Sequence, residues 1–144
     1  MRCFTIGHGN RSIEEFLALL AQYKISEVID IRSYPDSLFE QFNKSNLERT
    51  LRARKIKYIH SPELGEFQQF RGEAFKRGFS RLIKKIKSTQ ETGENLAIMC
   101  AEKKPKQCHR WQLAQLLEQM GVKVEHIIEL GQRSLLNFKS DESR

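Results

Sequence analysis

The sequence predicts a three-layer α/β fold, in which a mostly parallel sheet of about five strands is covered by helices on both faces. Short β-prone runs alternate with amphipathic segments of helical length along the chain. Residues 96–100 form a continuous apolar run, which is typical of a central parallel strand buried on both faces. Because parallel strands end at a common edge, we expect any ligand site beyond their carboxyl ends.

The first predicted unit is a strand, a tight loop and a helix. Residues 3–6 are β-prone and run into Gly7. Ser12 and Glu15 form an S-x-x-E capping box, which predicts the start of a helix. Apolar residues at helical spacing give this helix, over residues 13–24, one face to bury against the sheet.

The second unit begins with a strand at residues 27–32, apolar in its centre except for Asp30. Pro35 prevents the strand from continuing, because proline cannot donate to a sheet hydrogen bond. A helix then begins near residues 43–45 and ends at about residue 54, and a third strand covers residues 57–60.

The second half of the chain repeats this alternation. A long polar loop at residues 61–71 precedes a helix at 72–87 with an apolar face. The apolar strand at 96–100 leads through a turn to a helix that ends at Met120 before Gly121. Residues 122–128 form the last predicted strand.

Length and composition favour one globular domain. A chain of 144 residues has the length of a single domain, which we place at residues 1–134, with residues 135–144 as a C-terminal tail. Hydrophobic residues make up 39% of the chain and charged residues 30%, and no apolar run approaches the roughly 20 residues of a membrane span. The N-terminus lacks the apolar region of a signal peptide, so we expect a cytoplasmic protein.

The formal net charge of +7 favours anionic partners through long-range attraction. The partner is expected to be an anionic small molecule or a nucleic acid, and not a membrane. The oligomeric state is open, a homodimer included.

The loop after the first strand is a candidate anion site. Gly7 and Gly9 leave backbone N–H groups accessible close to a helix N-terminus, where anions are stabilised. His8 adds a titratable group at the same edge. The alternative is a tight turn that needs glycine for its backbone angles.

The end of the second strand supplies a buried carboxylate. Burial of Asp30 is costly unless the group is paired, and Arg32 projects from the same face of the strand. The pair is either a structural ion pair or the support that orients a catalytic histidine. Arg32 and Ser33 are candidate anion ligands.

Residues 100–110 carry the richest set of reactive side chains. At 100° per residue, His109 continues the apolar stripe of the last helix and points at the edge of the sheet. Arg110 lies at the flank of that stripe and is a candidate anion ligand. Cys100 and Cys108 act as a thiolate nucleophile, as metal ligands with His109, or as packing residues. We expect no metal and no cofactor, with these two cysteines as the candidates if a metal binds.

These residues lead to one main hypothesis and two alternatives. The first is an enzyme acting on a phosphate-bearing, nucleotide or nucleic-acid substrate. In it His8 or His109 is the acid or base, Asp30 or Glu102 orients that histidine, and Arg32 and Arg110 bind the anion. The alternatives are a non-catalytic nucleic-acid-binding module and a metal- or redox-responsive protein, so whether the protein is an enzyme stays open.

Four short motifs carry a resemblance to a known family. They are Thr-Ile-Gly-His at residues 5–8, Asp-Ile-Arg-Ser at 30–33, Cys-Ala-Glu at 100–102 and Cys-His-Arg at 108–110. Together, and in this order, they resemble the domain of unknown function 488 family of uncharacterised α/β proteins. The resemblance implies an α/β fold and points to the same site residues.

Overall fold

A five-stranded, fully parallel sheet forms the middle layer of the computed structural model, which describes residues 1–65, 72–107 and 110–130. The strand order is β3-β2-β4-β1-β5. The strands are β1 (Arg2–Gly7), β2 (Ile25–Asp30), β3 (Lys57–His60), β4 (Asn95–Cys100) and β5 (Lys123–Ile127). The predicted fold class is confirmed.

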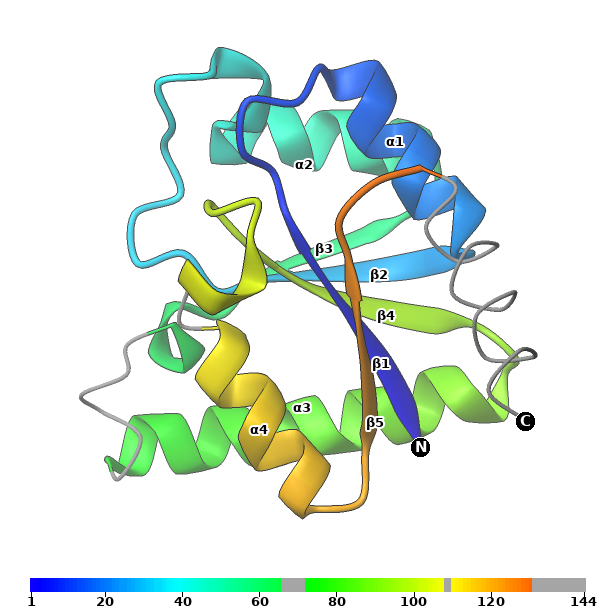
Figure 1. Cartoon of the computed structure of the whole chain (residues 1–144), viewed down its shortest axis with the longest axis vertical. Coiled ribbons are helices and arrows are strands. Elements are labelled where there is room, and N and C mark those ends of the chain that lie inside the picture. The colour runs from blue at the N-terminus through cyan, green and yellow to red at the C-terminus, as the bar shows by residue number, and fades with distance from the viewer. Residues whose placement is uncertain (66–71, 108–109, 131–144) are drawn as a thin grey trace.

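Helices cover both faces of this sheet (Figure 1). Helices α1 (Ile13–Gln22) and α2 (Lys44–Ala53) lie on one face, and α3 (Glu73–Glu91) and α4 (Arg110–Gln119) lie on the other. Short 3-10 helices η1 (Glu40–Phe42), η2 (Pro62–Leu64) and η4 (Pro105–Gln107) lie in the connections. At the start of α1, the Ser12 hydroxyl accepts from the Glu15 N–H at 3.1 Å, as the capping box predicts.

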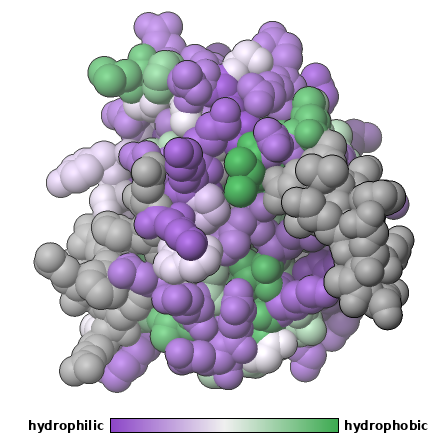
Figure 2. Space-filling view, viewed as in Figure 1, coloured by the Kyte–Doolittle hydropathy of each residue, from purple (hydrophilic) through white to green (hydrophobic). Residues whose placement is uncertain are grey.

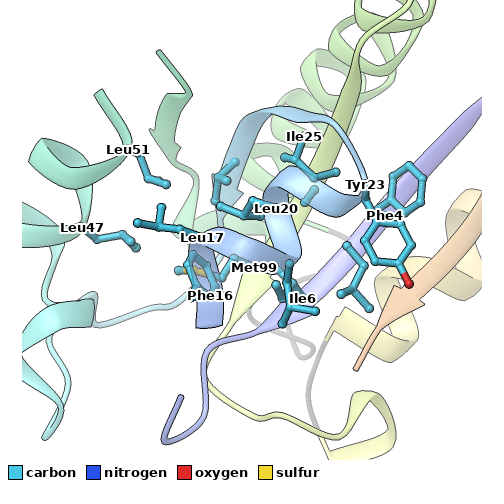
Figure 3. Close-up of a cluster of buried hydrophobic side chains, with 14 of the residues drawn as sticks. Phe4, Ile6, Phe16, Leu17, Leu20, Tyr23, Ile25, Leu47, Leu51 and Met99 are labelled. Atoms are coloured by element: carbon cyan, nitrogen blue, oxygen red, sulfur yellow. The ribbon is translucent and has the colours of Figure 1, made fainter. Parts of the chain in front are cut away.

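Each face of the sheet has its own hydrophobic core. Figure 3 shows the first, where Phe16 and Leu20 of α1 pack with Leu47 of α2 over Ile6 and Met99 of the sheet. The second core packs residues of α3 and α4 against the other face of the same strands. Alternate residues of β4 enter opposite cores because successive strand side chains point to opposite faces.

The topology creates a crevice at the carboxyl end of β4. The chain leaves β1 and β2 for the helices on one face, whereas it leaves β4 for α4 on the other. Ligands of parallel α/β sheets bind where neighbouring connections diverge in this way. The first strand pairs with the fourth, with Gly7 opposite Cys100, so the loops that follow both strands lie side by side at this crevice.

Several predictions fall outside the described residues. They concern Cys108 and His109, part of the long polar loop and the C-terminal tail at 135–144. Within the part of the chain that the structure describes, no helix combines the length and the apolar character that a membrane span requires.

Candidate functional site

A pocket of about 380 Å³ lies at the carboxyl ends of β1, β2 and β4. The residues that line it are His8, Ile31, Arg32, Ser33, Tyr34, Asp36, Ser37, Gly65, Cys100, Ala101 and Glu102. Four of the residues singled out from the sequence as catalytic or anion-binding therefore share one cavity: His8, Arg32, Ser33 and Glu102. Asp30 lies directly behind it, fully buried.

His8 is held in one tautomer by its two ring contacts. Its Nδ1 lies 2.9 Å from the Gly9 carbonyl oxygen, which can only accept a hydrogen bond, so Nδ1 carries the proton. Its Nε2 lies 3.3 Å from Nη1 of Arg32, which can only donate. The Nε2 lone pair therefore faces the guanidinium group, and a stacked Phe42 ring at 4.6 Å fixes the imidazole plane.

The surroundings of His8 keep its imidazole neutral. Burial lowers the pKa of His8 from its ordinary value of 6.5, and the nearby Arg32 charge lowers it further, against the opposing Gly9 hydrogen bond and Asp30. Only 3% of His8 is exposed. At neutral pH the residue is therefore a proton acceptor at Nε2 and not an imidazolium ion.

Asp30 and Arg32 form the buried ion pair that the sequence predicts. Nε and Nη2 of Arg32 donate to the two carboxylate oxygens at 2.9 and 2.8 Å, and the Arg32 backbone N–H donates to Oδ1 at 3.0 Å. Such a two-pronged pair has a fixed geometry. Nη1 of Arg32 also donates to the Phe42 carbonyl at 2.8 Å, which places it beside His8.

Strand β3 completes the surroundings of this ion pair. The hydroxyl of Tyr58 donates to Oδ2 of Asp30. Burial and this hydrogen bond raise the pKa of Tyr58, so its phenol stays protonated. The His60 Nε2 lies 2.6 Å from the Arg32 carbonyl oxygen. A continuous chain of polar contacts thus leads from Tyr58 through Asp30 and Arg32 to His8.

The glycine loop after β1 packs tightly against the end of β4. The backbone N–H groups of His8 and Gly9 donate to the carbonyls of Cys100 and Ala101, at 3.0 and 2.9 Å. These amides are therefore occupied by protein acceptors and not directed at a ligand. A Cβ added at Gly7 would lie 1.7 Å from the Glu102 carbonyl oxygen, which explains why this position holds glycine.

Arg110 braces the turn that follows β4. It is fully buried, and its Nη1 and Nη2 donate to the carbonyls of Glu102 and Lys103. Its Nε donates to the Thr5 hydroxyl at 3.1 Å. Burial and the Arg11 charge lower the pKa of Arg110 to about 10, against the opposing Glu102. This predicted anion ligand is not among the described residues that line the pocket.

A second histidine, His126, is partly buried beside Thr5 and Trp111. The Thr5 hydroxyl is 2.6 Å from Nδ1 of His126 and already accepts from Arg110, so it donates its proton to that nitrogen. Burial, with a smaller effect from Arg110, lowers the pKa of His126 to about 4. Trp111 stacks on the His126 ring with centroids 5.2 Å apart.

The remaining candidates differ in their surroundings. Glu102 and Ser33 line the pocket, and the Glu102 side chain is exposed. Cys100 is disulfide-bonded, and its Sγ also accepts from Nη1 of Arg110 at 2.8 Å. Among the described residues, no group of three His, Cys, Asp or Glu side chains is arranged to hold a metal ion.

Sequence reasoning missed three residues that shape the site. Arg11 is 1% exposed, and its Nε donates to the Gly7 carbonyl at 3.0 Å. Nη1 of Arg11 pairs with Glu15 at 3.0 Å, and this i, i+4 spacing is the one sequence signal for it. Phe42 and Tyr58 shape the site through contacts with residues of other strands and loops. The sequence carries no local signal for such contacts.

The comparison with protein families identifies the chain. The model of the domain of unknown function DUF488 matches residues 12–117, well over half of the sequence. The chain belongs to the DUF488 family. No curated protein and no solved structure matches it.

Part of the site lies outside the DUF488 match. The matched range contains Asp30, Arg32 and Arg110, whereas His8 precedes it and His126 follows it. The pocket wall from β1 and the Thr5–His126 contact are therefore described by the structure of this chain and not by the family match.

Proposed function

We propose that the protein is an enzyme that acts on a small substrate carrying an anionic group, with His8 as its general base. The observation that carries this proposal is the fixed, neutral imidazole at the pocket wall, with its Nε2 lone pair beside Arg32. A side chain held in one tautomer and lowered in pKa is typical of acid–base catalysis.

The contact between His8 and Arg32 suits proton transfer. At 3.3 Å it is a long hydrogen bond, so a substrate hydroxyl or a water molecule can replace the guanidinium group at Nε2 at little cost. Nε2 then accepts the proton of that O–H group and the ring becomes an imidazolium ion. The carboxylate of Asp30, behind Arg32, opposes the like-charge repulsion that this step creates.

Arg32 is the cation that we assign to the anionic group of the substrate. Four of its five N–H groups have side-chain or backbone partners in the protein, and Arg32 is the one cationic side chain among the described residues that line the pocket. The net charge of +7 attracts anions to the molecule as a whole. Arg110, in contrast, directs its donors at protein acceptors.

The anion site is tested by titration with inorganic phosphate, followed through the Arg32 Nε–H and His8 ring signals in NMR spectra. We expect saturable shifts of both signals in the wild-type protein. In Arg32→Lys, which keeps the charge but loses the planar guanidinium group, the phosphate affinity read from the His8 signal should be at least tenfold weaker. The exposed Arg49 serves as the matched control. Equal shifts at Arg49 and Arg32 would show surface binding and contradict the proposal.

The catalytic role is tested by screening phosphate esters for turnover with the wild-type protein and with His8→Gln. The amide of glutamine can still accept a hydrogen bond from Arg32, but it cannot take up a proton near neutral pH. We expect turnover to fall about 10²- to 10⁴-fold while the melting temperature changes little. Turnover that survives in His8→Gln would refute the assignment.

The alternative function is a non-catalytic nucleic-acid-binding module. A continuous basic surface with steeply salt-dependent affinity for nucleic acid, and no turnover, would favour this module instead.

A further inference from the structure

The side chains around the pocket do not fit an anion alone. Arg32 is the one cationic residue in the described lining, and its charge is balanced by the buried Asp30. Two carboxylates, Asp36 and Glu102, also line the pocket, and both residues are exposed. A ligand that consists only of anionic groups would be repelled by them. A ligand that also carries hydrogen-bond donors can use these two carboxylates as acceptors.

The mouth of the pocket adds an aromatic surface. Tyr34 lines the pocket, follows Arg32 by two residues and is 86% exposed. Most large apolar side chains of the described residues are buried. Leu38 and Phe39, which lie on the same loop as Tyr34, are exposed. Figure 2 shows hydrophobic side chains over this loop between β2 and α2. An exposed ring beside a polar pocket is suited to stacking on a flat ligand group.

We infer that the substrate is a nucleoside phosphate, whose base stacks on Tyr34 while its phosphate reaches Arg32. This ligand class combines the three features that the lining requires: a flat ring, hydroxyl or amino donors for Asp36 and Glu102, and one compact anion. The volume of about 380 Å³ falls within the range of small-ligand pockets. The inference rests on the proposed function, since it names the substrate class of the same pocket.

Tyr34 is the specificity-determining residue in this assignment. Stacking of a base on an aromatic side chain contributes enough free energy to change affinity by about 5- to 150-fold. Tyr34→Ala removes the ring, whereas Tyr34→Phe keeps it. Leu38→Ala is the matched control, because Leu38 is 98% exposed on the same loop and does not line the pocket.

The test compares binding of adenosine 5′-monophosphate, ribose 5-phosphate and inorganic phosphate by calorimetry. We expect the nucleotide to bind at least about fivefold more tightly than ribose 5-phosphate. This preference should disappear in Tyr34→Ala and persist in Tyr34→Phe and Leu38→Ala. All four proteins are also checked for unchanged melting temperature.

The outcomes separate this inference from the proposed function. Equal, Arg32-dependent binding of the nucleotide and ribose 5-phosphate would overturn the nucleoside assignment and leave the anion site standing. Adenosine that binds as tightly as its monophosphate would overturn the role of Arg32. A single-stranded oligonucleotide that binds at least tenfold more tightly than the mononucleotide would overturn the assignment in favour of a polymer.

Discussion

His126 makes the stability of this protein depend on pH below neutrality. Its Nδ1 accepts the Thr5 proton, and burial and Arg110 lower its pKa to about 4, whereas an exposed histidine in the unfolded chain has a pKa near 6.5. Above pH 6.5 the ring is neutral in both states. As the pH falls from 6.5 to 4, the unfolded state takes up the proton first, so the free energy of unfolding decreases.

The difference between these two pKa values corresponds to a loss of about 3 kcal/mol at most. Because His126 is only partly buried, we expect about 1–3 kcal/mol between pH 7 and pH 4.5. The variant His126→Asn isolates this effect, because Oδ1 of asparagine can still accept from Thr5 but does not titrate. Any constant cost of the lost stacking with Trp111 cancels in the comparison.

The assay is urea unfolding of both proteins at pH 7 and pH 4.5. The wild-type protein should lose about 1–3 kcal/mol more than His126→Asn between the two pH values. Equal losses in the two proteins would refute the reasoning. An NMR titration of the His126 ring gives an independent check, since the ring should remain neutral at pH 5.

Three further predictions concern the pocket. Gly7→Ala should prevent stable folding, measured by circular dichroism, because the new Cβ would lie 1.7 Å from the Glu102 carbonyl oxygen. Tyr58→Phe should lower the free energy of unfolding by about 1.5–3 kcal/mol, measured in urea, because Asp30 loses a donor to its charged oxygen. The pH profile of kcat/KM for any substrate found should rise with pH, with a midpoint below pH 6.5, because His8 must be neutral to act as the base.

Matched controls separate these predictions from general effects of substitution. Gly93 has a φ of +75° and no atom within 4 Å of an added Cβ, so Gly93→Ala should cost only about 1 kcal/mol of backbone strain. Tyr34→Phe removes a hydroxyl from an 86% exposed ring and should leave stability unchanged. If Gly7→Ala folds as well as Gly93→Ala, the close approach of β1 to the turn after β4 is refuted. A rising limb of the pH profile centred above pH 7 would exclude His8 as the base.

The sequence predicts the fold well because strand and helix periodicities are local signals. The apolar run that becomes β4 predicts a central strand, and the structure places it between β1 and β2. The partner of Asp30 is predictable for a related reason. A carboxylate inside an apolar strand needs compensation, and Arg32, two residues on, is on the same face.

The roles of the arginines are less accessible to sequence reasoning. Helical geometry places Arg110 at the edge of the sheet. An arginine at this place can either bind an anion or hold a turn by hydrogen bonds, and the sequence pattern is the same in both cases. What separates them is which acceptors surround the guanidinium group, and the carbonyls of Glu102 and Lys103 come from an irregular turn. Arg11 illustrates the same point, because its burial depends on the Gly7 carbonyl and on the end of β5.

The orientation of His8 depends on residues from three other parts of the chain. Phe42 stacks on the ring from η1, Arg32 faces Nε2 from the end of β2, and Tyr58 holds Asp30 from β3. Each of these contacts joins segments far apart in sequence, so no local pattern contains them. They also explain how a single histidine in a glycine loop acquires a fixed tautomer, since its neighbours on both sides are buried and fully constrained. The chemistry of the pocket is therefore a property of the strand order, which brings β1 and β2 to either side of β4.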